Sequence, residues 1–261
     1  MYYLSISAIF RQETKWLKEW LDYHINRGVE HFYLYNNDLD PEEAAGTLKP
    51  YCDRGVVESI HVPENGIQLI LMQDILKKAA GKTEWLALID LDEFIFPRRN
   101  SDIREILDNY QKFSALTVNW MIYGTSGYHS SPPDQINHLL WRAEDAFSVN
   151  QHVKTILKPD LAIPECIPNP HAFYYHTGHA VGEKYQVVDS PFQEYSGEII
   201  RINHYVLRSV RDYWDVKVKR GLASWSHDRG QEFFDHHDRN EVFDDEISEK
   251  YGDEVLTQKD S

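Results

Sequence analysis

Residues 85–94 read WLALIDLDEF, and this stretch decides the fold class. Trp85 to Ile89 is an unbroken apolar run, which is typical of a parallel strand covered on both faces of its sheet. The acidic residues Asp90, Asp92 and Glu93 follow at once. Ligands of open α/β sheets bind beyond the carboxyl ends of the strands. The stretch therefore predicts both a buried strand and a functional site at its end.

Strand and helix signals alternate on the N-terminal side of this stretch. Strands are expected at Leu4–Phe10, His31–Tyr35 and Val56–Val62, and apolar stripes at helical spacing begin near Trp16 and Ile67. Such alternation predicts an α/β fold with a Rossmann-like, mostly parallel central sheet flanked by helices. Further polar clusters follow the first two strands, at residues 11–13 and 36–38.

On the C-terminal side of the stretch the pattern is mixed. A helix is expected after Ser101, and a long loop of small residues covers 123–133. Strands are expected at 115–120, 153–157, 173–175 and 199–202, and a late helix at 209–222. No linker, repeat or low-complexity tract interrupts the chain. We therefore expect a single domain over 1–261, with a functional boundary near residue 97 and an acidic C-terminal segment, 228–261.

The composition is that of a globular, acidic protein. The chain has 261 residues and a formal net charge of -15, of which -8 falls in the last 34 residues. This charge disfavours nucleic acid and anionic membrane surfaces as partners. Cys52 and Cys166 are expected to be free thiols, and the alternative is a single disulfide between them. With neither a membrane span nor a signal peptide in the sequence, we expect a cytoplasmic protein with at most peripheral membrane contact.

Asp90 and Asp92 are the first candidates for metal binding. If the backbone stays extended after the strand, both carboxylates point the same way and require a cation nearby. Oxygen ligands of this kind suit Mg²⁺ or Mn²⁺. His204, after a later strand, is a candidate third ligand. The alternatives are a solvated acidic turn and a hydrogen-bonded core histidine.

Other polar residues are candidates for binding a nucleotide or a sugar. The nucleotide candidates are Arg11, Glu13, Asn37, Asp38, Gln68, Gln73 and Asp90, with Lys154 among the basic residues that can neutralise a diphosphate. The acceptor candidates are Trp120, Tyr128, His129 and His171, because sugar rings stack on aromatic side chains. The alternative for each is an ordinary cap, turn or core residue.

Taken together, these segments resemble glycosyltransferase family 92. The resemblance is carried by residues 13–33, 89–94, 119–127 and 202–221, with Val153-Lys154 and Pro170-His171 between them. It implies a GT-A fold, a UDP-sugar donor, a divalent cation and inversion at the anomeric carbon. It also implies metal binding by Asp90 and Asp92 with His204, a nucleotide-sugar half at 1–97 and an acceptor half at 98–227.

The resemblance makes a hexosyltransferase, with galactose as the expected sugar, the first functional hypothesis. The membrane anchor of animal and plant members is not found in this sequence, which favours an enzyme of bacterial surface polysaccharide synthesis acting at the inner face of the membrane. Two alternatives are a sugar-1-phosphate nucleotidylyltransferase and a non-catalytic sugar-nucleotide-binding module. A nucleotidylyltransferase of this kind usually has a glycine-rich loop after its first strand, and this chain lacks such a loop.

An inverting transferase needs a side chain that removes the proton of the acceptor hydroxyl. The loop carboxylates Glu165, Asp134 and Asp238 are the candidates, with Glu165 favoured because it precedes the matched Pro170-His171 segment. The alternative for each is a surface carboxylate.

Overall fold

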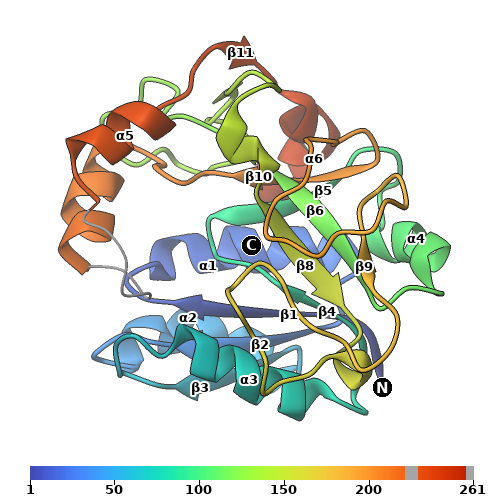
Figure 1. Cartoon of the computed structure of the whole chain (residues 1–261). Coiled ribbons are helices and arrows are strands. Elements are labelled where there is room, and N and C mark those ends of the chain that lie inside the picture. The colour runs from blue at the N-terminus through green and yellow to red at the C-terminus, as the bar shows by residue number, and fades with distance from the viewer. Residues whose placement is uncertain (221–228, 257–261) are drawn as a thin grey trace.

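The computed structural model describes residues 1–220 and 229–256. Within them, one nine-stranded sheet has the order β3-β2-β1-β4-β8-β6-β10-β5, with β9 beside β6 (Figure 1). Its strands are β1 (Tyr2–Phe10), β2 (His31–Asn36), β3 (Val57–His61), β4 (Thr83–Leu88), β5 (Glu93–Pro97), β6 (Ala115–Ile122), β8 (Val153–Leu157), β9 (Ala180–Val181) and β10 (Ile200–His204). A separate ribbon pairs β7 (Trp141–Arg142) with β11 (Val242–Phe243).

The first four strands are parallel, and β1, β2 and β4 are buried on both faces, whereas the edge strand β3 is largely exposed. Trp85 and Ala87 of β4 enter the core that contains α1 (Thr14–Asn26) and α2 (Glu42–Asp53). The alternate residues Leu86 and Leu88 enter the core beneath α3 (Gln68–Ala79). Figure 1 shows α1 and α3 on opposite sides of β1. This two-sided burial explains the unbroken apolar run and confirms the predicted α/β class.

The second half continues the same sheet with mixed strand directions. β8 is antiparallel to both β4 and β6, β10 is parallel to β6, and β5 closes the edge antiparallel to β10. The sheet thus joins both halves of the chain. The carboxyl end of β10, at His204, lies opposite Glu93 at the start of β5. This register brings the late histidine to the acidic stretch.

Three details differ from the sequence-based expectations. The helix α2 was not expected; it contains Pro50, and its exposed face obscures the apolar stripe of Ala44, Leu48 and Tyr51. The strand β5 starts at Glu93, the last residue of the acidic stretch, and was not expected. Residues 173–175 form only an isolated bridge, between Tyr175 and Ala162.

The last elements cover the body of the protein. α4 (Ile103–Leu107) is capped by the side chain of Asp102, which precedes it, and not by Ser101. The late helix contains a π-helical segment, Asp212–Val218, and its expected end at 221–222 lies outside the described residues. α5 (Gln231–His237) and α6 (Glu246–Leu256) follow. Among the described residues, no helix is both long enough and apolar enough to cross a membrane.

Candidate functional site

A cavity of about 620 Å³ opens at the carboxyl ends of the parallel strands. Both halves of the chain contribute to it. Its polar side is lined by Arg11, Glu13, Asn37, Asn65, Gln68, Asp90, Asp92, Lys154, Arg220 and Arg229. Its aromatic side is lined by Trp120, His152, His171, His204, Phe233, His236 and His237. The cavity lies where the sequence predicted a site.

The acidic stretch forms a turn and not an extended segment. The amide of Glu93 donates to the carbonyl oxygen of Asp90 at 3.1 Å, and β5 begins at Glu93. The premise that both aspartates point the same way from an extended backbone is therefore wrong. Each carboxylate instead has its own lysine.

Asp90 pairs with Lys154 on the neighbouring strand β8. The Lys154 Nζ lies 2.8 Å from Asp90 Oδ2 and 3.5 Å from Glu93 Oε1. Burial raises the pKa of Asp90, but Lys154 outweighs it and lowers that pKa. Burial raises the pKa of the enclosed Glu93 well above its usual value despite Lys154. Asp90 is thus the ionised partner of Lys154, and its side chain is 40% exposed to the cavity.

Asp92 pairs with Lys217 and His204. Its Oδ2 contacts Lys217, from the π-helical segment, and its Oδ1 lies 3.5 Å from His204 Nε2. Burial alone would raise the pKa of Asp92, but Lys217 and His204 hold it well below its usual value. Burial lowers the pKa of Lys217 to about 8. π-Helical turns are frequent at functional sites, and this one delivers a buried ammonium to the acidic turn.

The residues around Asp92 fit a divalent cation. Single ligand atoms of Asp92, Glu93 and His204 lie within 4.8 Å of one another. Two ligand atoms each about 2.1 Å from an ion lie about 3.0–3.6 Å apart at ordinary bond angles. The 3.5 Å between Asp92 Oδ1 and His204 Nε2 meets this requirement. Asp90 is not in this group, although the sequence analysis expected it to be a ligand.

A second buried ion-pair network supports the cavity from Glu13, the residue before α1. Glu13 lies 2.8 Å from Arg208 Nη1 and 2.9 Å from Arg220 Nη1. Arg220 and then Arg208 overcome the effect of burial and lower the pKa of Glu13. Arg208 also donates to the carbonyl oxygen of Leu91, inside the acidic turn, at 3.1 Å. Arg208 therefore ties the first helix to the Asp90–Glu93 turn.

The cavity is more positive than the chain that contains it. Among the described lining residues, four cations (Arg11, Lys154, Arg220 and Arg229) face three carboxylates (Glu13, Asp90 and Asp92). Arg229 has no carboxylate within 4 Å in residues 1–220 and 229–256. The whole chain, in contrast, carries a formal net charge of -15. This balance suits a ligand with several negative charges.

The nucleotide candidates divide into two groups. Arg11, Glu13, Asn37, Gln68, Asp90 and Lys154 line the cavity, whereas Asp38 and Gln73 do not. Asp38 instead accepts a hydrogen bond from the amide of Gln12, which has a left-handed backbone with φ 54°. Asp38 therefore shapes the turn after β1, as in the alternative interpretation.

The acceptor candidates divide in the same way. Trp120 and His171 line the cavity; Tyr128 and His129 do not. Their loop instead holds the C-terminal segment, because the amides of Thr125 and Ser126 donate to Asp238 at 2.7 Å and to Asn240 at 2.9 Å. The small residues of this loop permit close packing of the C-terminal segment.

None of the three loop carboxylates proposed as the base lines the cavity. Glu165 is 65% exposed and pairs with Lys77. Asp134 is buried and lies 3.0 Å from His138, and Asp238 accepts from the amide of Thr125. The sequence analysis did not single out Arg229 or His152, because neither stands in a recognisable motif.

The comparisons with known proteins agree with the resemblance. The model of glycosyltransferase family 92 matches residues 1–258. A family 92 protein of Oryza sativa subsp. japonica is 24% identical over 85% of this chain and 37% of its own. A galactan beta-1,4-galactosyltransferase of Arabidopsis thaliana is 27% identical over 40% of this chain and 22% of its own. The chain thus spans less than two fifths of the length of these relatives.

Solved structures show weaker likeness. TarS of S. aureus, residues 1–349 in complex with UDP, has a TM-score of 0.40 at 13% identity, over 60% of this chain and 47% of its own. HddC from Yersinia pseudotuberculosis has a TM-score of 0.42 at 13% identity, over 85% of this chain and all of its own.

Proposed function

We propose that this chain, which belongs to glycosyltransferase family 92, transfers a hexose from a nucleotide-sugar donor to a glycan or lipid-linked sugar acceptor. One observation supports this most: a cavity with a surplus of cations beside Asp92 and His204, in a strongly acidic chain. A nucleoside diphosphate carries the charge that such a cavity attracts. The carboxyl edge of a parallel sheet is the place where such ligands bind.

The donor that we propose is a UDP-hexose, with galactose as the first sugar to test. The names of two Arabidopsis relatives, both galactan beta-1,4-galactosyltransferases, support galactose. Arg11 and Asn37, at the ends of β1 and β2, and Gln68, at the start of α3, would bind the nucleoside, and Arg220 and Arg229 the diphosphate. A role in surface polysaccharide synthesis belongs to the same proposal.

We propose that Asp92 and His204 would hold Mn²⁺ or Mg²⁺. When bound, such an ion neutralises the diphosphate as negative charge develops on it. Lys217 keeps Asp92 ionised from the other side, so that one carboxylate oxygen stays available for the ion. Asp90 stays with Lys154, outside the ligand group.

Transfer with inversion is a single displacement. The acceptor hydroxyl oxygen forms a bond to the anomeric carbon while the bond from that carbon to the diphosphate oxygen breaks. Arg220 and Arg229 stabilise the departing charge. The hydroxyl proton needs an acceptor within the cavity, and Asp90 has the most exposed side chain of the three cavity carboxylates. We therefore assign this proton transfer to Asp90, in place of the loop carboxylates.

The test measures thermal stabilisation by UDP-galactose, UDP-glucose and GDP-mannose, each with and without Mn²⁺, followed by transfer to 1,4-linked galactose oligosaccharides. Stabilisation by one UDP-hexose and elongation of the oligosaccharide are expected. Formation of UDP-galactose from UTP and galactose-1-phosphate would favour the nucleotidylyltransferase alternative. Binding without transfer or donor hydrolysis would favour the non-catalytic module.

A further inference from the structure

Three histidines on the aromatic side of the cavity share one hydrogen-bonding arrangement. The Nδ1 atoms of His152, His171 and His237 lie 3.0, 2.8 and 2.8 Å from backbone carbonyl oxygens. A carbonyl oxygen only accepts hydrogen bonds, so each Nδ1 carries a proton and donates it. A neutral imidazole with its proton on Nδ1 has a lone pair on Nε2. The backbone thus fixes the same tautomer in all three rings.

The Nε2 atoms of these rings are free to accept hydrogen bonds. Within residues 1–220 and 229–256, no hydrogen bond is made by Nε2 of His152, His171 or His237. Burial, assisted by Lys154, lowers the pKa of His171 to about 3. Burial also lowers the pKa of His237 to about 4, and that of His152. The three rings are therefore neutral at physiological pH.

Trp120 holds two of these rings in place. His152 stacks on it with ring centroids 5.0 Å apart and planes 18° apart, and His171 meets it edge to face at 5.2 Å. The centroids of His152 and His171 are 5.8 Å apart. The two rings are packed rigidly and each carries one acceptor atom, so together they form a preorganised surface for a ligand with several hydroxyl groups.

We propose that His152 and His171 form a subsite for a neutral sugar ring, whose hydroxyl groups donate hydrogen bonds to the two Nε2 atoms. The proposal rests on the proposed function and names the class of sugar that its site accepts. A sugar acid is disfavoured in the same place, because a carboxylate has no proton to donate and its charge faces two lone pairs. Donor hexose and acceptor sugar share this chemistry, so the experiment separates them.

The test uses asparagine and glutamine variants. In His152→Asn and His171→Asn, the side-chain amide can still donate to the backbone carbonyl but no acceptor remains at the position of Nε2. In His171→Gln, the side chain places a polar atom near that position again. His129→Asn, at an exposed histidine outside the cavity, is the control.

Binding is measured by calorimetry in two arms. The donor arm compares UDP, UDP-galactose and UDP-galacturonic acid; the acceptor arm compares 1,4-linked oligosaccharides of galactose and of galacturonic acid. In one arm the protein should bind the neutral sugar at least about tenfold more tightly than the acid. Both asparagine variants should lose that preference, His171→Gln should retain part of it, and UDP should bind equally to every variant.

The arm that shows the preference identifies the sugar. Equal binding of neutral and acidic sugars in both arms, or a preference that the asparagine variants retain, would overturn the subsite while UDP binding leaves the proposed function intact. A wild-type chain that binds neither UDP nor UDP-galactose would overturn the proposed function, and the subsite with it.

Discussion

At the scale of single residues, lysines supply the positive charge that the sequence analysis assigned to a metal ion. Two neighbouring carboxylates need positive charge, and Asp90 receives it from Lys154 and Asp92 from Lys217. The acidic pair by itself is therefore no evidence for a metal. The stronger evidence is the second carboxylate oxygen of Asp92, Oδ1, which does not contact Lys217 and lies 3.5 Å from His204 Nε2.

The first prediction separates the roles of the two aspartates. Asp92→Asn should raise the Mn²⁺ concentration needed for half-maximal donor binding and reduce turnover by about 10² or more, because the ion loses its charged ligand. Asp90→Asn should reduce transfer with donor binding retained. Donor binding is measured by calorimetry and transfer by product formation.

Glu165→Gln is the control for this pair, since Glu165 is exposed and bound to Lys77 away from the cavity. It should keep the wild-type transfer rate. Near-wild-type turnover of Asp92→Asn in the presence of EDTA would contradict the proposed ion site.

The second prediction concerns Arg208, which is nearly inaccessible and has a left-handed backbone with φ 60°. Its guanidinium donates to Glu13, Gln135 and the carbonyl oxygen of Leu91. The compact ammonium group of a lysine cannot donate to these three acceptors as the planar guanidinium does. Arg208→Lys should therefore lower the free energy of unfolding by about 2–3 kcal/mol, measured by urea denaturation. The exposed Arg211→Lys should change it by less than about 0.5 kcal/mol, and equal losses would contradict the role of Arg208.

At the scale of elements, hydrophobic patterning predicted the buried strands best. β1, β2 and β4 present apolar residues to both cores, so their sequences are continuous and readable. α2 was missed because an internal proline and exposed residues interrupt its pattern, and β5 because a tight turn separates it from β4. These elements are specified by packing, which a local pattern does not contain.

The same argument applies to the site. Asp92 and His204 meet because β10 pairs with β5 in a register that depends on contacts across the chain. The family resemblance supplied that pair, whereas spacing alone left it undecided. No local pattern marked His152 or Arg229, because their place in the cavity results from loops that converge only in the folded protein.

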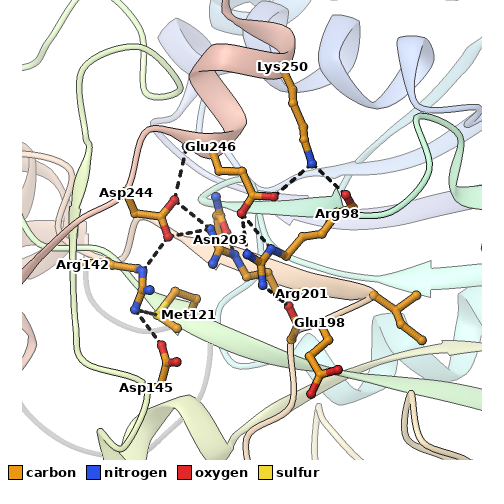
Figure 2. A network of polar contacts seen from close by, with 12 residues as sticks. Arg98, Met121, Arg142, Asp145, Glu198, Arg201, Asn203, Asp244, Glu246 and Lys250 are labelled. Carbon is orange, nitrogen blue, oxygen red and sulfur yellow. Dashed lines mark hydrogen bonds and ion pairs between the residues drawn. The ribbon is translucent and has the colours of Figure 1, made fainter.

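The acidic C-terminal segment is bound to the body of the protein by arginines (Figure 2). Asp244 lies 2.6 Å from Arg142 Nε and 3.0 Å from Arg201 Nη2, and Arg201 is almost fully buried. Glu246 pairs with Arg98 in a more exposed position. Part of the negative charge that suggested an acidic tail therefore holds β11 and α6 against the sheet.

The third prediction tests this attachment. Asp244→Asn should lower the free energy of unfolding by about 3 kcal/mol, because it leaves the buried Arg201 without its carboxylate. Glu246→Gln, which removes a half-exposed pair, should lower it by less than about 1 kcal/mol. Urea denaturation measures both. Equal, small losses would show that the segment is held by apolar packing alone.

At the scale of the whole molecule, the charge is divided between an acidic exterior and a cavity with more cations than carboxylates. The stability of such a protein depends on pH through the buried groups whose pKa values differ between the folded and unfolded states. Glu19 of α1 is one group outside the cavity for which this dependence can be isolated. Its carboxylate accepts hydrogen bonds from the amides of Gln135 at 2.7 Å and Ile136 at 3.0 Å.

The last prediction is a loss of stability with rising pH that originates at Glu19. Burial raises the pKa of Glu19 from 4.5 to about 7 despite the two amide donors. Between these values the folded state keeps a proton that the unfolded state releases, so stability is highest below pH 4.5 and falls as the pH rises towards 7. The residue keeps partial solvent contact, so the loss is at most about 3 kcal/mol.

Glu19→Gln isolates this effect, because a glutamine oxygen can still accept both amide hydrogen bonds and has no charge to bury. The variant and the wild type should have similar free energies of unfolding at pH 4.5. At pH 8 the variant should be more stable by about 1–3 kcal/mol. Urea denaturation of both proteins at matched pH values measures the difference, in which the other titrating groups cancel. A difference that stays constant from pH 4.5 to 8 would mean that Glu19 ionises as easily in the folded protein as in the unfolded chain.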